Sequence, residues 1–299
     1  MDDPGRERRE KQRMSLEVTV VQACRRSGRG GSRTAVVTDT ELRDSTRRAI
    51  PAAVGASHAV FISTQDPAAV RLRFFTSTGE LPACGHGTVA ALAVLAQDAG
   101  EYEGMLQTAA GLLPGHAIGR EGEYSAAFTP GPIELHAAAA EVADPILSAL
   151  GVGTETVACH VASVGRPRLL VELADQQTLT NLAPDMPRLR AATDRLGLLG
   201  CYAYVSPSAD GRTVARMFAP SIGVPEDIAN ANSTACLAAY LSTRGHSRLQ
   251  VDMGDSLGHP ATMITTVTAT SGPPIVEVGG QVAICVSAER VEEPIDSGR

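Results

Sequence analysis

The stretch RLRFFTSTGELPACGHGTVAALAVL, residues 71–95, decides the expected fold of this chain. Residues 71–75 predict a strand that leads into a glycine-containing turn. Residues 90–95 are apolar and good helix formers, which predicts a buried helix. Cys84 and His86 lie at the expected N-terminus of that helix, where unpaired backbone N–H groups and the positive dipole end attract anions. This junction is therefore the best candidate for an active site.

The composition is that of a globular protein and excludes several kinds of partner. Of the 299 residues, 43% are hydrophobic, 20% are charged and 3% are aromatic. A net charge of −7 gives no reason to expect nucleic acid or an anionic membrane surface as a partner. The lack of an apolar run of about 18 residues predicts no transmembrane helix. The charged segment 1–13 has no apolar region typical of a secretory signal, and we expect a disordered tail there.

The counts of lysine and cysteine exclude further classes of catalysis. Lys11 is the only lysine and lies in the expected tail, so pyridoxal phosphate chemistry and a Walker A loop are excluded. We expect no cofactor, and catalysis by Cys, His, Asp, Glu or Ser. The six cysteines form no C-x-x-C pair, which argues against a zinc site or disulfides and indicates a reduced cytoplasm. The remaining histidines lack metal-ligand spacing, so we expect no metal.

A second stretch repeats the layout of the first. Residues 214–220 again contain an Arg-x-Phe strand, and residues 233–241 again predict an Ala/Leu helix. Two such halves predict α+β lobes, each presenting a helix N-terminus to a shared cleft. In the first half, residues 40–53 predict a further helix with Asp39 or Thr40 as its N-cap.

Two long motifs of the chain resemble the PhzF family of phenazine biosynthesis-like proteins, which have the diaminopimelate epimerase fold. The first motif is RFFT at residues 73–76 with ELPACGHGT at residues 80–88. The second is FAPSIGVPED at residues 218–227 with AAYL at residues 238–241. Shorter similarities lie at residues 164–171, 258–261 and 278–282, so the resemblance covers roughly residues 17–287.

The resemblance implies an α+β fold of two pseudo-symmetric lobes, each a mixed β-sheet wrapped around a central helix. We expect residues 14–130 with 281–292 to form the N-terminal lobe, and residues 131–280 to form the C-terminal lobe. Family members are cofactor-independent isomerases, epimerases or racemases, usually homodimers. The implied function is an isomerase that moves a proton or a double bond on a small carboxylate-bearing, amino-acid-like substrate. The expected pathway makes a specialised, antibiotic-type metabolite.

The resemblance also implies roles for individual residues. His58 stands where phenazine-type members carry a catalytic Glu, and a histidine that titrates near neutral pH suits a proton shuttle. Cys84 matches the first thiol of the racemases of this fold, whereas the second thiol position falls on Asn230. Asp227 is expected to handle a proton or to bind substrate. The expected substrate contacts, at the N-termini of the two helices, are Gly85, His86, Gly87, Asn230, Asn232 and Ser233.

Several alternatives stay open at this point. His58 could be an ordinary histidine at a strand start, Cys84 a packed small hydrophobic side chain, and Asn232 and Ser233 helix caps. The same fold would allow a racemase, epimerase or dehydratase that uses Cys84 as its single thiol. A non-catalytic relative that only binds a ligand or a partner is the alternative from another class.

Overall fold

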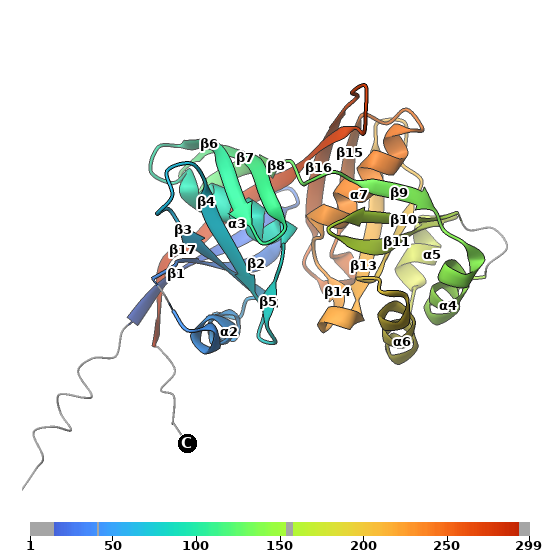
Figure 1. Ribbon diagram of the computed structural model, residues 1–299, viewed down its shortest axis with the longest axis horizontal. Helices are drawn as coiled ribbons and strands as arrows, with labels where there is room; N and C mark the ends of the chain where they lie inside the picture. The colour runs from blue at the N-terminus through green and yellow to red at the C-terminus, as the bar shows by residue number, and fades with distance from the viewer. Residues whose placement is uncertain (1–14, 41, 154–157, 293–299) are drawn as a thin grey trace, which may run out of the picture.

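The computed structural model describes residues 15–40, 42–153 and 158–292 of the chain. Figure 1 shows two lobes side by side, each with one helix enclosed by β-strands. This is the predicted α+β architecture of mixed sheets around central helices. The predicted tail, residues 1–13, lies outside the described residues. No helix within the described ranges is long and apolar enough to cross a membrane.

The N-terminal lobe is a closed sheet around one apolar helix. Its elements are β1 (Ser15–Arg25), β2 (Ser32–Thr38), α2 (Asp44–Ala53), β3 (His58–Ser63), β4 (Val70–Phe75), β5 (Glu80–Leu81), α3 (Gly85–Leu95), β6 (Glu101–Thr108), β7 (Gly111–Arg120), β8 (Glu123–Phe128) and β17 (Ile275–Glu292). Strand β17, the last of the chain, closes the ring by pairing with both β1 and β8. Helix α3 is apolar on all sides and is buried inside this ring from Gly85 to Ala93.

The C-terminal lobe wraps an open sheet around helix α7. Its elements are β9 (Glu134–Ala137), α4 (Ala140–Leu150), β10 (Cys159–Val164), β11 (Arg166–Leu173), α5 (Gln176–Asn181), α6 (Met186–Leu196), β12 (Cys201–Val205), β13 (Arg212–Ala219), β14 (Val224–Asp227), α7 (Ala231–Ser242), β15 (Arg248–Met253) and β16 (Ala261–Thr268). Helices α4 and α6 cover the face of the sheet opposite to α7.

Strand β17 belongs to both lobes. It pairs with β16 from Ile275 to Gly279 and with β1 from Gln281 onward, so it runs from one lobe into the other (Figure 1). The expected lobe boundary at residue 281 falls inside this strand. That boundary and the one at residue 130 stay predictions.

The repeated Arg-x-Phe strands have the same local structure in both lobes. Arg73 of β4 forms a two-pronged ion pair with Glu80 of β5, at 2.8 and 2.7 Å. Arg216 of β13 pairs in the same way with Glu226 of β14, at 2.9 and 2.8 Å. Each guanidinium also lies over a phenylalanine ring, 5.0 and 4.9 Å from its centre. Both pairs hold the short strand that leads to the N-terminus of an enclosed helix.

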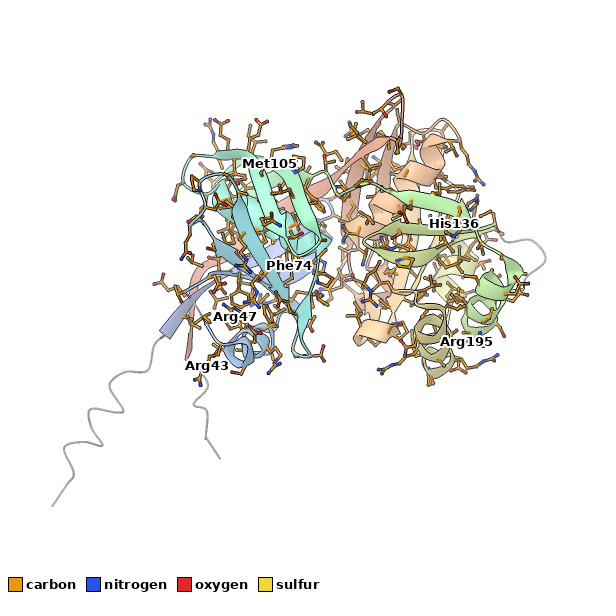
Figure 2. The ribbon with its side chains drawn as sticks, in the orientation of Figure 1. Arg43, Arg47, Phe74, Met105, His136 and Arg195 are labelled. Carbon is orange, nitrogen blue, oxygen red and sulfur yellow. The ribbon has the colours of Figure 1, made fainter. Side chains whose placement is uncertain are left out.

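Helix α2 begins later than the sequence predicted. The helix expected over residues 40–53 begins at Asp44, and neither Asp39 nor Thr40 is its N-cap. Asp39 instead forms an ion pair of 2.7 Å with Arg47, a buried arginine of α2 labelled in Figure 2. The capping prediction was wrong because a tertiary ion pair uses the carboxylate.

The two enclosed helices meet at their N-termini. A Cβ atom at Gly85 of α3 would lie 2.6 Å from the Cβ of Ala231 in α7 and 3.3 Å from its Cα. Atoms in a packed protein interior do not approach so closely without displacement. Glycine at position 85 is therefore what allows the two lobes to bring their helix ends together.

We expect Gly85→Ala to lower the free energy of unfolding by about 1–3 kcal/mol, because the added methyl group must push the helix ends apart. Urea denaturation measures this change. Gly131→Ala is the matched control, since a Cβ at Gly131 meets no atom within 4 Å. Equal stability of the two variants would contradict the close contact between the helices.

Candidate active site

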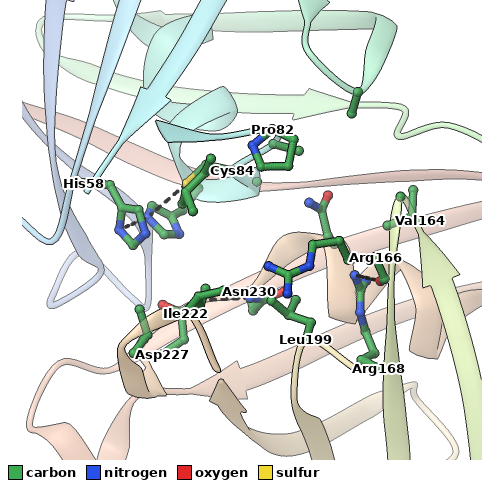
Figure 3. A pocket seen from close by; sticks show the side chains of 18 residues that line it. His58, Pro82, Cys84, Val164, Arg166, Arg168, Leu199, Ile222, Asp227 and Asn230 are labelled. Atoms are coloured by element: carbon green, nitrogen blue, oxygen red, sulfur yellow. Dashed lines mark hydrogen bonds between the residues drawn. The ribbon is translucent and has the colours of Figure 1, made fainter. Parts of the chain in front are cut away.

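A pocket of about 250 Å³ lies between the lobes, next to both helix N-termini. Figure 3 shows Cys84 and His58 on one wall, and Asp227, Asn230 and the arginines on the other. Most of the surface between these groups is apolar. Its apolar side chains are Leu81, Pro82, Ala83, Ala110, Val164, Leu199, Ile222 and Val224. An apolar pocket with a few convergent polar groups is typical of a site for a small molecule.

Most of the residues expected from the sequence line this pocket. They are His58, Cys84, Gly85, His86, Asp227, Asn230 and Asn232. The other two, Gly87 and Ser233, pack behind its walls. A Cβ at Gly87 would lie 3.0 Å from the ring of Phe74. The hydroxyl of Ser233 is fully buried, 3.5 Å from the sulfur of Met217.

Three buried side chains form the polar centre of the pocket. Nε2 of His86 lies 3.0 Å from Nδ1 of His58 and 3.4 Å from Sγ of Cys84. The other nitrogen of His86, Nδ1, lies 3.0 Å from the carbonyl oxygen of Ala229. A carbonyl only accepts, so Nδ1 of His86 carries a proton. Its Nε2 is then the atom that faces both His58 and Cys84.

The local structure explains why these side chains converge. His58 is the first residue of β3, a strand that pairs in parallel with β2 inside the N-terminal lobe. Cys84 is the N-cap residue of α3 in an extended conformation, and His86 is in the first turn of that helix. A strand start and a helix start from two separate segments thus meet at one point. Ser57 adds a hydroxyl 2.9 Å from Nδ1 of His58.

The environment keeps His58 neutral. Burial, followed by the neighbouring ring of His86, holds the pKa of His58 well below its ordinary value. His58 is therefore an imidazole that can take up or pass on a proton at neutral pH. Within the described residues its Nδ1 has partners, whereas no partner is seen for its Nε2.

The environment favours a charged His86. Burial alone would lower the pKa of this ring, but the sulfur of Cys84 and the carboxylate of Asp227 act in the opposite direction. Together with the Ala229 carbonyl they outweigh burial and raise the pKa of His86 to about 9. The two rings therefore have pKa values that are shifted in opposite directions, a feature of acid–base pairs in active sites.

The N-terminus of α7 is capped by Asn230, not by Asn232 or Ser233. Oδ1 of Asn230 accepts the backbone N–H of Ser233 at 2.9 Å. Its Nδ2 donates to Asp227 at 3.0 Å, which fixes the carboxylate at the pocket wall. At the facing helix, α3, no side chain caps the first turn. The backbone N–H groups at the start of α3 can therefore bind an anion.

The three central side chains could also hold a metal ion. One ligand atom from each of His58, Cys84 and His86 lies within 4.8 Å of the others. Imidazole and thiolate are ligands that Zn²⁺ prefers, and the hydrogen bond from His86 to Ala229 would orient its ring. In the sequence Cys84 and His86 are separated by one residue, but no short ligand spacing connects them with His58.

Two arginines of the pocket were not predicted from the sequence. Arg166 and Arg168 line the pocket from the start of β11, after a turn at Gly165 with a φ of 81°. Two basic residues beside a turn give only a weak signal, because most such residues are solvated. Their place in the site follows from the position of the β10–β11 hairpin beside α7.

The fold is of the diaminopimelate epimerase-like class, in which two lobes enclose a shared cleft. The chain belongs to the family of phenazine biosynthesis-like proteins, whose family model matches residues 21–288.

Individual relatives agree with this assignment. The chain is 31% identical over 278 residues to an uncharacterized isomerase of Deinococcus radiodurans, covering 87% of this chain and 88% of that protein. It is 27% identical to a trans-2,3-dihydro-3-hydroxyanthranilate isomerase of Pseudomonas chlororaphis over 64% of this chain and 68% of that one. A PhzF-family phenazine biosynthesis protein of Bacillus anthracis has the same fold, with a TM-score of 0.77 and 18% identity, covering 93% of this chain and 99% of that one.

We expect Cys84→Ser to lower the pKa of His86 from about 9 toward its ordinary value, because the variant removes the sulfur that favours the charged ring. Titration of the ¹⁵N chemical shifts of the histidine rings measures this change. Cys285→Ser is the control, since Cys285 is an exposed cysteine outside the pocket. A pKa for His86 that stays the same in Cys84→Ser would mean that the thiol does not act on the ring.

Proposed function

We propose that this isomerase moves a proton between carbon atoms of a small carboxylate-bearing substrate without a cofactor, using His58 as the proton carrier. The observation that carries the proposal is the 3.0 Å contact between a neutral His58 and a His86 that favours the charged form. Relatives that are named isomerases support the reaction class. The substrate itself is an inference from the site and from the family.

In the proposed mechanism the two histidines act as a relay. Nε2 of His58 accepts the proton from the substrate carbon, while the proton on its Nδ1 passes to Nε2 of His86. His86 then carries a proton on both nitrogens, held by Ala229 and stabilised by the Cys84 sulfur. In the return step His86 gives its Nε2 proton back to Nδ1 of His58. His58 then delivers the proton on its Nε2, which exchanges with solvent in the intermediate, to another carbon of the substrate. No proton is gained or lost in the cycle.

The substrate carboxylate has a binding place next to the relay. The N-termini of α3 and α7 meet at Gly85 and Ala231, so the positive ends of both helix dipoles point to one region. Donors there would stabilise the negative charge that develops when the carbon loses its proton. Asp227 lies on the opposite wall, where a substrate amino group would find a carboxylate.

Three further expectations belong to this proposal. The relative that is named trans-2,3-dihydro-3-hydroxyanthranilate isomerase supports a role in making a specialised, antibiotic-type metabolite. We expect a homodimer, as the family resemblance implies. We also expect a reducing compartment such as the cytoplasm, since all six cysteines are free.

We expect His58→Gln to lower turnover by about 100-fold or more, because a positioned acid–base group contributes a factor of this size. The assay is deuterium uptake from D₂O into candidate substrates, with trans-2,3-dihydro-3-hydroxyanthranilate and proline among them. His116→Gln is the control, because His116 is about half exposed on β7 and contacts Glu277 outside the pocket. Unchanged deuterium uptake in His58→Gln would refute the relay. No uptake by the wild-type protein across the panel would favour a non-catalytic relative.

We expect the rate of deuterium uptake to rise with pH and to level off above about 9. The first step needs a neutral His86 to receive a proton, and its pKa is raised to about 9, so the neutral form increases as the pH approaches that value. Cys84→Ser should move this rise to lower pH.

The same pH profile tests the one-thiol alternative. If Cys84 were the base and a charged His86 its partner, the rate of deuterium uptake would not rise as His86 loses its proton. It would be flat below about pH 9 and fall above it, and Cys84→Ser would abolish turnover. The contact of 3.4 Å between Cys84 and His86 is the observation that favours catalysis by a single thiol as the second candidate function.

A further inference from the structure

Arg168 is a buried arginine that has no negatively charged partner among the residues that the structure describes. It is 1% exposed, although it lines the pocket. Its Nη1 donates to the sulfur of Cys236 at 3.2 Å and its Nη2 to the carbonyl of Arg166 at 2.6 Å. Its Nε has no hydrogen-bond partner in the part of the chain that the structure describes. Burial keeps the pKa of Cys236 above its ordinary value, so that sulfur is a neutral thiol and does not balance the charge.

Other enclosed arginines of this protein have carboxylate partners. Arg47, 5% exposed, pairs with Asp39 at 2.7 Å. Arg216 pairs with Glu226 at 2.8 Å. A buried charge without a partner destabilises a fold, and proteins usually avoid it. The unbalanced charge of Arg168 therefore points to an anion that the protein itself does not supply.

Arg166 adds a second positive charge at the same end of the pocket. Its side chain extends into the pocket in Figure 3, toward Asn230. Its backbone carbonyl is held by Arg168, which ties the two residues together. No ion pair or hydrogen bond of its guanidinium is seen with the described residues. The planar guanidinium group, which can form two parallel hydrogen bonds with a carboxylate or a phosphate, is thus free to bind a ligand.

The charges of the pocket are unequal. Arg166 and Arg168 face Asp227, which is the one carboxylate among the described lining residues. The charged form of His86 is not added to this balance, because it depends on the neighbouring sulfur of Cys84. The meeting helix N-termini add further positive potential. A zwitterionic amino acid would bring one carboxylate, and its amino group would pair with Asp227. At least one arginine would then still lack a counter-charge.

We propose that Arg166, supported by the charge of Arg168, binds a second anionic group of the substrate. The substrate class is then a small molecule with two anionic groups, the second one a carboxylate or a phosphate. This inference rests on the proposed function, because it concerns the substrate of the same pocket. One anionic group lies at the helix N-termini beside the histidine relay, and the other lies at the arginine end. The apolar side chains between them contact the carbon skeleton.

The test compares ligand pairs that differ in one charge. Binding to the full-length protein is measured by calorimetry for L-glutamate against L-glutamine and for O-phospho-L-serine against L-serine. We expect the more anionic member of at least one pair to bind about tenfold tighter or better, the effect of one strong charged hydrogen-bonded pair. The pair that shows the difference identifies the second group as a carboxylate or a phosphate. Equal affinity in both pairs, or no binding of either anionic member, would overturn the inference.

Arg166→Gln removes the charge and leaves a shorter, neutral side chain that ends in an amide. We expect this variant to lose the tenfold preference and to keep the weaker binding of the neutral member. Arg212→Gln is the matched control, because Arg212 is 65% exposed on β13 and pairs with Asp210 outside the pocket. A preference that persists in Arg166→Gln would also overturn the inference.

Deuterium uptake separates this inference from the proposed function. Uptake that depends on His58, without any preference for the anionic ligands, would refute the second anion site and leave the relay intact. A preference that depends on Arg166, without any deuterium uptake, would refute the relay and leave the anion site intact.

Discussion

The contact between the N-termini of α3 and α7 is the constraint on which the rest of this structure depends. Each helix is enclosed by its own sheet, so the position of its first turn is fixed by the packing of a whole lobe. The two first turns meet where Gly85 has no side chain and Ala231 has only a methyl group. Two positive dipole ends are thereby brought together, which is unfavourable unless an anion lies between or beside them. The architecture itself therefore supports the proposed binding of an anionic group at this point.

The chemistry of the pocket follows from an asymmetry between two adjacent histidines. Both rings are buried and 3.0 Å apart, yet their surroundings differ. His58 has a serine hydroxyl and a second imidazole beside it, and neither stabilises a positive charge. His86 has the sulfur of Cys84, the carboxylate of Asp227 and a backbone carbonyl near it, and all three raise its pKa. In the proposed relay the shared proton passes to His86 when the substrate carbon is deprotonated and returns to His58 when a carbon is protonated again.

Much of this fold could be predicted because its determinants are local. The Arg-x-Phe strands each carry their own ion pair with a glutamate a few residues ahead, so the motif and its structure lie within one hairpin. The start of β3 at His58 and the buried helix after Cys84 are likewise properties of short stretches. The prediction of the N-cap of α2 was wrong because a contact between separate segments decided it. Asp39 is a good capping residue, but its carboxylate forms a buried ion pair with Arg47.

The pocket was predictable only in part. The pocket residues inside the two long motifs were predicted, because both motifs lead to helix N-termini, where ligands often bind. Arg166 and Arg168 were missed because charged residues beside a turn are usually solvated. Nothing in the sequence says that Arg168 becomes buried without a carboxylate beside it. The cap role of Asn230 was also missed, because Asn232 and Ser233 beside it are equally suitable capping residues.

The sequence by itself determined the α+β class, the repeat of two lobes and the residue types available for catalysis. These properties depend on the order of apolar and polar residues and on composition, and the lysine-free body of the chain is one example. Only the tertiary structure decided that His58, Cys84 and His86 form one hydrogen-bonded group, and that two arginines face them across the cleft. Distances between segments far apart in the chain are set by how two closely packed lobes meet. The pKa values of the histidines depend on those distances and on burial.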